Sequence, residues 1–148
     1  MVTLHHLAPY VVASHARDSA VWPHPRGCAW QWVAMGDGNV GIKAWSQAYC
    51  SMCATTSYTM EIITGVPPRI LNYLEPEYWE AFPDTPSWEF ARFEQLVRHG
   101  TPYVDPMVAP ARGPIPPEYE AALAVQDRID LERSVRWVRE ELGLGERA

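Results

Sequence analysis

The chain has few of the residues that mark several common classes of protein. Its 148 residues include three cysteines, and one lysine against eleven arginines. An odd, small number of cysteines does not suit a disulfide framework. No apolar run approaches the roughly 20 residues that a membrane helix needs, and the N-terminus lacks the basic and apolar segments of a signal peptide. We therefore expect a cytoplasmic chain with no membrane partner.

The negative charge of the chain is concentrated in its second half. The formal net charge is −6; through Leu74, four basic and three acidic residues give +1, and from Glu75 onward eight arginines and fifteen acids give −7. An acidic chain repels the phosphate backbone of nucleic acids. Nucleic acid is therefore not expected as a partner.

Aromatic residues are abundant, with seven Trp, seven Tyr and three Phe. Together with an apolar content of 47%, they indicate one globular domain with a real core. In a chain of this size some of them must stay exposed, and exposed Trp and Tyr anchor protein interfaces. The aromatic residues of the second half, up to the connector, are Tyr73, Tyr78, Trp79, Phe82, Trp88, Phe90 and Phe93.

The region after the turn residues 36–39 has a helical pattern. From Ile42 to Ile63 the large residues recur at steps of three and four, and Gly65 followed by two prolines is a stop signal. This spacing predicts a central helix over 41–64. The alternative is a small β-hairpin over 28–45, centred on the turn residues.

Prolines divide the second half into short pieces. Eleven of the fourteen prolines lie between Pro67 and Pro117, which predicts short helices, one of them over 87–99, and extended connectors. Residues 101–117 contain six prolines and are expected to form a connector without regular structure.

A long helix is expected after this connector, near 117–142. It carries an apolar stripe of Leu131, Val135, Val138 and Leu142. We thus divide the chain into a helical core domain (1–100), a connector (101–117) and a C-terminal helix (118–148) that packs on the core or serves as an interface arm. The predicted fold class is mainly α.

Histidine and cysteine spacing suggests zinc as the one cofactor. His24-x3-Cys28 and Cys50-x2-Cys53 supply two ligand pairs of the type that tetrahedral zinc prefers. The alternative is that Cys50 and Cys53 are small buried residues, because both lie on a stripe of small side chains.

The cysteine pattern is superficially similar to that of the zinc nucleoside deaminases, which pair Cys-Ala-Glu with a later Pro-Cys-x-x-Cys. Here Trp30 stands where that family has its proton-transferring glutamate, and Tyr49 replaces the proline. The chain is therefore not assigned to that family. Glu61 is the acid that an enzyme of this kind would use if burial in an apolar helix raised its pKa. The alternative, which is the more common case, is that such a residue lies at the solvent-exposed edge of the helix.

These observations favour a non-enzymatic function. We expect a small accessory or structural protein that binds other protein chains through its C-terminal helix and exposed aromatic side chains, with a structural zinc on His24, Cys28, Cys50 and Cys53. The alternative is a small zinc-dependent enzyme with hydrolase or deaminase-like chemistry. In it Cys28, Cys50 and Cys53 hold zinc, water takes the fourth position, and Glu61 or a histidine transfers protons.

Overall fold

The computed structural model describes residues 2–105, 107–110 and 113–145. The helices are α1 (Val2–Leu7), α2 (Ile42–Met52), α3 (Ser87–His99) and α4 (Pro117–Leu142), with the 3-10 helices η1 (Ala8–Tyr10) and η2 (Pro76–Ala81). The strands are β1 (His15–Ala16), β2 (Asp18–His24), β3 (Gly27–Val33), β4 (Thr59–Met60) and β5 (Arg69–Leu71). Among these residues, no helix combines the length and the apolar composition needed to cross a membrane.

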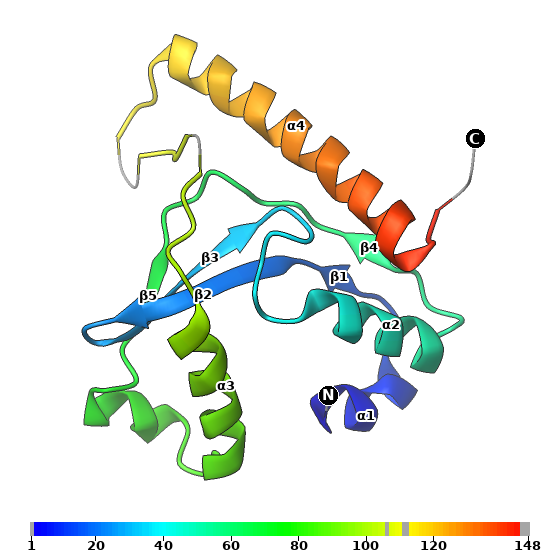
Figure 1. Cartoon of the computed structure of the whole chain (residues 1–148), viewed down its shortest axis with the longest axis vertical. Helices are drawn as coiled ribbons and strands as arrows, with labels where there is room; N and C mark the ends of the chain where they lie inside the picture. Colours follow the sequence, from blue (N-terminus) through cyan, green and yellow to red (C-terminus); the bar gives the residue numbers. More distant parts are fainter. Residues whose placement is uncertain (1, 106, 111–112, 146–148) are drawn as a thin grey trace.

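A three-stranded antiparallel sheet, in the order β2-β3-β5, lies at the centre of the molecule (Figure 1). β2 and β3 form a hairpin in which Asp18 faces Val33 and His24 faces Gly27. A Cβ atom at Gly27 would lie 2.2 Å from the backbone oxygen of Leu71. Glycine is needed there because β5 passes so close to the hairpin.

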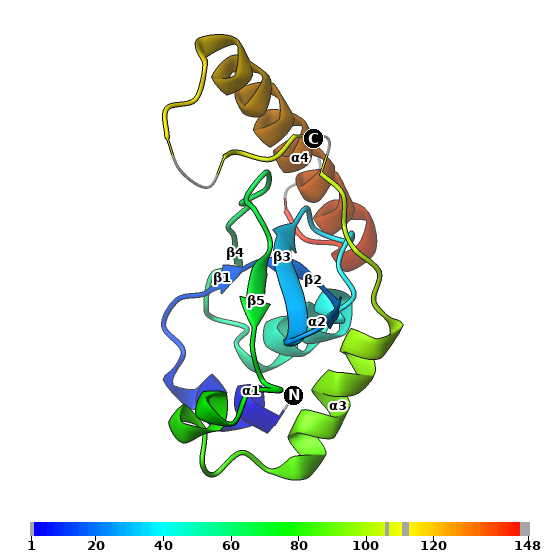
Figure 2. The ribbon, with the colours of Figure 1, turned by 90° about the vertical axis from the view of Figure 1, so that its left-hand side faces the viewer.

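Helices lie on both sides of this sheet. α3 is on one side and α4 on the other, and the view turned by 90° shows the same order (Figure 2). Val21 and Cys28 pack toward α3, in one hydrophobic cluster with Val97. Ala20, Trp22, Ala29 and Val33 form a second cluster, against which Tyr103 packs.

The mainly-α prediction is wrong. The structure is 46% helix and 15% strand and is a mixed α/β fold with two small sheets. Both faces of β2 and β3 carry buried residues, and a strand covered on both faces loses the apolar and polar alternation that identifies strands in a sequence. The hairpin predicted over 28–45 is also wrong, because β3 pairs with β2 and β5.

The central helix is correct only in its first half. α2 ends at Met52, and the next residues form a turn in which the N–H of Thr56 donates to the oxygen of Cys53 (2.9 Å). Residues 54–57 read Ala-Thr-Thr-Ser, and Thr and Ser favour turns over helix interiors. The chain then forms β4, which pairs in parallel with β1.

The C-terminal helix is confirmed at Pro117–Leu142, and the helix at Ser87–His99 is confirmed as α3. The buried residues of α4 are Gln126, Asp130, Ser134 and Val138, spaced by four. Of the predicted apolar stripe, only Val138 is buried, and Leu131 is 47% exposed. The face of α4 that packs on the fold is therefore largely polar.

Hydrogen bonds connect this polar face to the rest of the molecule. The Gln126 amide accepts from the N–H of Met107 (2.9 Å) and donates to its oxygen (3.2 Å). The Ser134 hydroxyl accepts from the N–H of Met35 (3.0 Å). Arg133 reaches Asp37 at 2.6 Å. These contacts join α4 to the connector and to the loop after β3.

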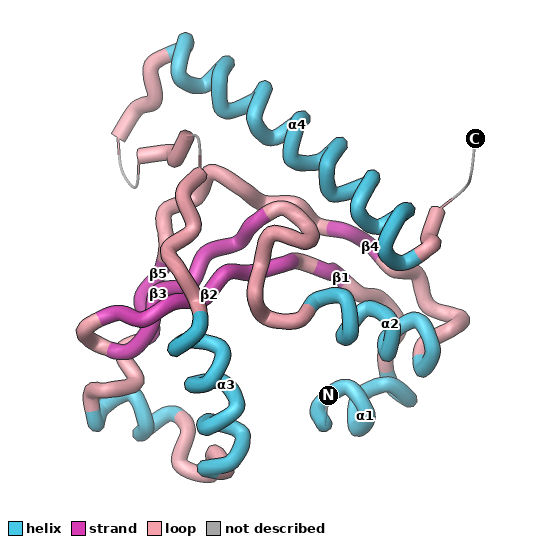
Figure 3. The backbone as a smooth tube through the Cα atoms, viewed as in Figure 1, coloured by secondary structure: helices cyan, strands magenta, loops and turns pink. Residues whose placement is uncertain are grey.

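The connector between α3 and α4 runs as a loop, as predicted, where the structure describes it (Figure 3). It nevertheless contributes to the interior, because Asp105 is only 7% exposed. One oxygen of Asp105 accepts a hydrogen bond from the side chain of Gln31, and the other has no hydrogen-bond partner among the residues that the structure describes. Burial, with a smaller contribution from Asp130, raises the pKa of Asp105 to about 6.

Candidate functional site

His24 and Cys28, the first predicted ligand pair, lie at the closed end of the β2–β3 hairpin. Cys28 is fully buried against Tyr73 and Val97. Burial, with a smaller contribution from Glu94, raises the pKa of its thiol to about 11. A thiol with a raised pKa is a weaker metal ligand, because zinc binds the thiolate.

Cys50 and Cys53, the second pair, lie at the end of α2. Cys53 is buried in a hydrophobic cluster with Leu4 and Tyr49, and Cys50 packs against this cluster. Burial raises the pKa of Cys50, and the neighbouring Cys53 adds to the effect. Both side chains therefore pack as small apolar residues in the structure.

Cys28 belongs to one hydrophobic cluster, whereas Cys53, with Cys50 packed against it, belongs to another. Within the described ranges, no group of three or more His, Cys, Asp or Glu side chains is arranged to hold a metal ion. The structure therefore does not bring the four predicted ligands together. Zinc binding stays a prediction, and metal analysis of the purified chain tests it, since the four-ligand site requires about one zinc per chain.

Glu61 follows β4 and is not part of a helix. Its carboxylate forms an ion pair with Arg17, and its second oxygen lies 2.8 Å from Nδ1 of His15. The hydrogen bond from Arg17 is the main reason why the pKa of Glu61 is lowered. The raised pKa that the enzymatic alternative requires is therefore not found, and a carboxylate held in the ionised form is a weak general base.

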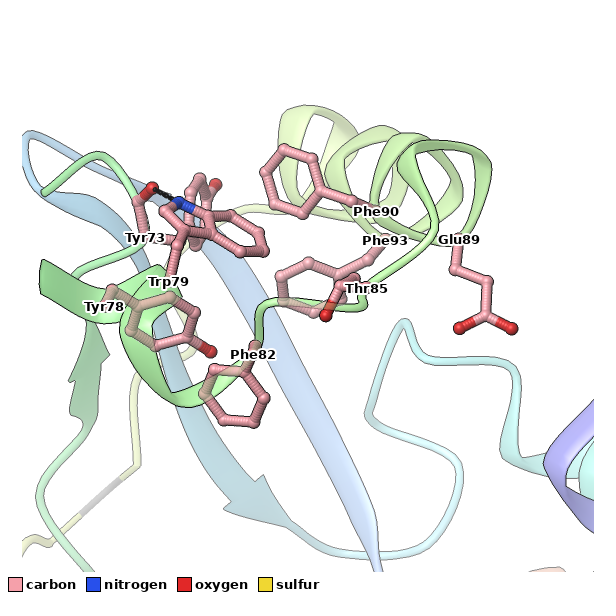
Figure 4. Close-up of a pocket in the computed structure, with 8 residues that line it drawn as sticks. All are labelled: Tyr73, Tyr78, Trp79, Phe82, Thr85, Glu89, Phe90 and Phe93. Atoms are coloured by element: carbon pink, nitrogen blue, oxygen red, sulfur yellow. Dashed lines mark hydrogen bonds between the residues drawn. The ribbon is translucent and has the colours of Figure 1, made fainter. Parts of the chain in front are cut away.

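A different site is formed by aromatic residues of the segment after β5, of η2 and the residue that follows it, and of α3. Their side chains enclose a cavity of about 250 Å³, here called the aromatic pocket (Figure 4). Six of its eight lining residues carry aromatic rings. The lining residues are Tyr73, Tyr78, Trp79, Phe82, Thr85, Glu89, Phe90 and Phe93.

Proline residues shape the two helices that carry the pocket. Pro76 lies in the first turn of η2, where its missing N–H costs nothing. After η2 the N–H of Thr85 donates to the oxygen of Phe82 (3.3 Å), and Pro86 precedes the first residue of α3. This turn reverses the chain, so that the rings of η2 face those of α3 (Figure 4).

The rings form a deep wall and an outer wall. In the deep wall, the rings of Trp79 and Phe90 pack edge to face with their centres 5.0 Å apart. The rings of Tyr73 and Phe90 pack in the same way, with their centres 5.1 Å apart. In the outer wall, the rings of Tyr78 and Phe82 lie 5.1 Å apart at an angle of 30°. Phe82 is 49% exposed, whereas Tyr73 is buried. The pocket thus extends from the core to the surface.

Hydrogen bonds hold the deep wall in place. The indole N–H of Trp79 donates a hydrogen bond to the backbone carbonyl oxygen of Tyr73 (2.7 Å). The hydroxyl of Tyr73 donates a hydrogen bond to the carboxylate of Glu94 (2.6 Å). Burial and then this contact with Glu94 raise the pKa of Tyr73. Because these polar atoms are already paired, the deep wall offers a ligand mainly ring surface. Glu89 is the charged residue of the lining.

The six aromatic residues of this pocket are evident in the sequence between Tyr73 and Phe93, but nothing in the sequence groups them. Their separation into core and exposed positions depends on the turn after η2. No signal in the sequence identified Thr85 or Glu89. Comparison with protein-family models, with curated proteins and with solved structures gave no match.

Proposed function

We propose that the protein is a non-enzymatic interaction module that binds a segment of another protein chain in the aromatic pocket. The observation that carries the proposal is a preformed cavity between six aromatic side chains, with a hydrogen-bonded deep wall and an exposed outer wall. A pocket that exists before binding saves the free energy needed to order its side chains.

The size of the pocket favours a side chain over a whole small molecule. Its volume of about 250 Å³ lies below the roughly 300–1,000 Å³ of sites for drug-sized ligands. Grooves lined by aromatic residues are a recurring way to bind peptide segments, and aromatic side chains supply much of the binding free energy at protein interfaces.

Exposed apolar residues close to the pocket in the sequence support a longer contact. Leu74, which precedes η2 in the sequence, is 66% exposed, and Trp88, which follows η2 in the sequence, is 50% exposed. A bound peptide would place one residue in the aromatic pocket and neighbouring residues over this surface. Exposed apolar side chains such as those of Leu74 and Trp88 are typical of a protein contact surface.

The outward face of α4 supports a second contact with the partner protein. Because the packed face of this helix is mostly polar, two of its apolar residues point away from the fold. Val125 is 47% exposed, and Ile129, about one turn further along the helix, is 49% exposed. This agrees with the expectation that the C-terminal helix contributes to partner binding, in addition to the exposed aromatic side chains.

Selection from a displayed peptide library with the full chain as the target tests the proposal. We expect Phe82→Ala to weaken the selected peptides about tenfold or more, because hot-spot aromatic residues contribute about 2 kcal/mol or more. Tyr10→Ala is the control, since Tyr10 is an exposed aromatic residue of η1 that neither lines the pocket nor lies close to it in the sequence. Circular dichroism verifies that both variants fold. Peptides that bind the Phe82→Ala variant unchanged would contradict the proposal.

A further inference from the structure

The aromatic pocket lies in a strongly acidic segment of the chain. Residues 75–94 contain six acids and one base, Arg92, which gives a charge of 1 − 6 = −5. This segment therefore accounts for most of the net charge of −6. The acids are Glu75, Glu77, Glu80, Asp84, Glu89 and Glu94.

Two of these acids are neutralised within the fold. Glu75 lies 2.7 Å from Arg26, and Glu94 lies 3.1 Å from Arg98. The other four form no ion pair with any cation of the described part of the chain. Glu89 is one of them, and it lines the pocket itself. The pocket therefore lies in a negative potential that attracts a cation and repels an anion.

The rings themselves favour a cation as well. The face of an aromatic ring carries partial negative charge and attracts a cation within about 6 Å of its centre. The protein already uses this interaction in its own sheet, where Arg17 lies 4.6 Å from the ring centre of Trp32, and Arg69 lies 5.0 Å from the same ring. No Lys, Arg or His is found among the residues that line the aromatic pocket.

We propose that the aromatic pocket binds a cationic side chain, an arginine or a methylated lysine, of a peptide segment in the partner protein. This inference rests on the proposed function and specifies its ligand. The rings contact the flat guanidinium or the methylated ammonium group, and Glu89 and the neighbouring carboxylates supply the opposite charge. A neutral side chain would gain only the apolar contact.

The experiment uses a peptide that was selected from the displayed peptide library by its binding to the full chain. Its basic residue is replaced by citrulline, which keeps the shape of arginine without the charge. Because a cation over aromatic rings gains about 0.5–2 kcal/mol, we expect the citrulline peptide to bind about 3- to 30-fold more weakly. Raising the salt concentration from 50 to 500 mM should weaken the arginine peptide more than the citrulline peptide.

A charge variant of the protein provides the second arm. Glu89→Gln should weaken the arginine peptide and leave the citrulline peptide unchanged. Glu118→Gln is the control, because Glu118 is an exposed acid at the start of α4 and does not line the pocket.

The outcomes separate this inference from the proposed function. Selected peptides that lack a basic residue, or equal affinity for the arginine and citrulline peptides, would overturn the cation inference. In either case a loss of binding in Phe82→Ala would leave the proposed function intact. If the library gives no peptide whose binding depends on Phe82, both proposals fail.

Discussion

Replacing Asp105 by Asn should stabilise the protein at neutral pH. Asp105 is nearly inaccessible to solvent, and within the described part of the chain one of its oxygens has no hydrogen-bond partner. Its pKa of about 6, against 3.8 for an ordinary aspartate, means that the folded state disfavours the ionised carboxylate. Asn keeps the shape and an acceptor for the Gln31 amide, and it carries no charge.

The size of the effect follows from the difference in pKa. A shift of about two units corresponds to roughly 3 kcal/mol at most, since one unit corresponds to 1.36 kcal/mol. Because the pKa of Asp105 is raised, the penalty is fully present above about pH 6 and disappears as the pH falls toward 4. Asn leaves a buried NH₂ group that costs part of the gain. We therefore expect Asp105→Asn to add about 1–2 kcal/mol to the free energy of unfolding at pH 7.5.

Urea denaturation at pH 7.5 and pH 5 measures this effect. Between these two pH values the wild-type penalty from Asp105 should fall by about 1–1.5 kcal/mol, so the advantage of the Asn variant should shrink by that amount. Asp84→Asn, at an exposed position, controls for the change in net charge. An Asn variant that is less stable than wild type at pH 7.5, or that keeps the same advantage at pH 5, would refute this reasoning.

Three further predictions concern packing around the sheet. Ser134→Ala should lower the free energy of unfolding by about 1–3 kcal/mol, because the buried N–H of Met35 loses its acceptor; an unchanged urea midpoint would argue against this contact. Gly100→Ala should cost at least about 1–3 kcal/mol, because the new Cβ would lie 1.8 Å from the oxygen of Val21, and a melting temperature equal to wild type would be inconsistent with that approach. Removing residues 117–145 should abolish cooperative thermal unfolding, since α4 supplies partners for buried backbone groups; a truncated chain that melts as before would instead identify α4 as a separate arm.

The sequence alone located the elements whose signals are local. α3 and α4 follow from helical spacing, from prolines at their starts and from glycines after their ends. The irregular connector follows from its prolines, which cannot continue a helix or donate to a sheet. The exposure of some aromatic residues, such as Phe82 and Trp88, also follows from the sequence, because Trp and Tyr are too abundant in a chain of this size for all of them to be core.

The strands depended on the tertiary structure. β2 and β3 carry buried residues on both faces, because one face packs toward α3 and the residues of the other form a cluster against which Tyr103 of the connector packs. This hides the period of two. The helical spacing from Ile42 to Ile63 continued past Met52, where side-chain and backbone hydrogen bonds of Thr56 form a turn. Residue spacing alone does not report such competition between helix and turn.

The candidate site divides in the same way. Composition and order along the chain determined that aromatic and acidic residues are concentrated between Tyr73 and Glu94. Only the tertiary structure decided that the turn after η2 brings six rings around one cavity, while Cys28 lies in a different hydrophobic cluster from Cys50 and Cys53. The physical reason is that residue types and local spacing are properties of the sequence, whereas a pocket or a ligand set requires distant segments to meet, and their meeting depends on the packing of the whole chain.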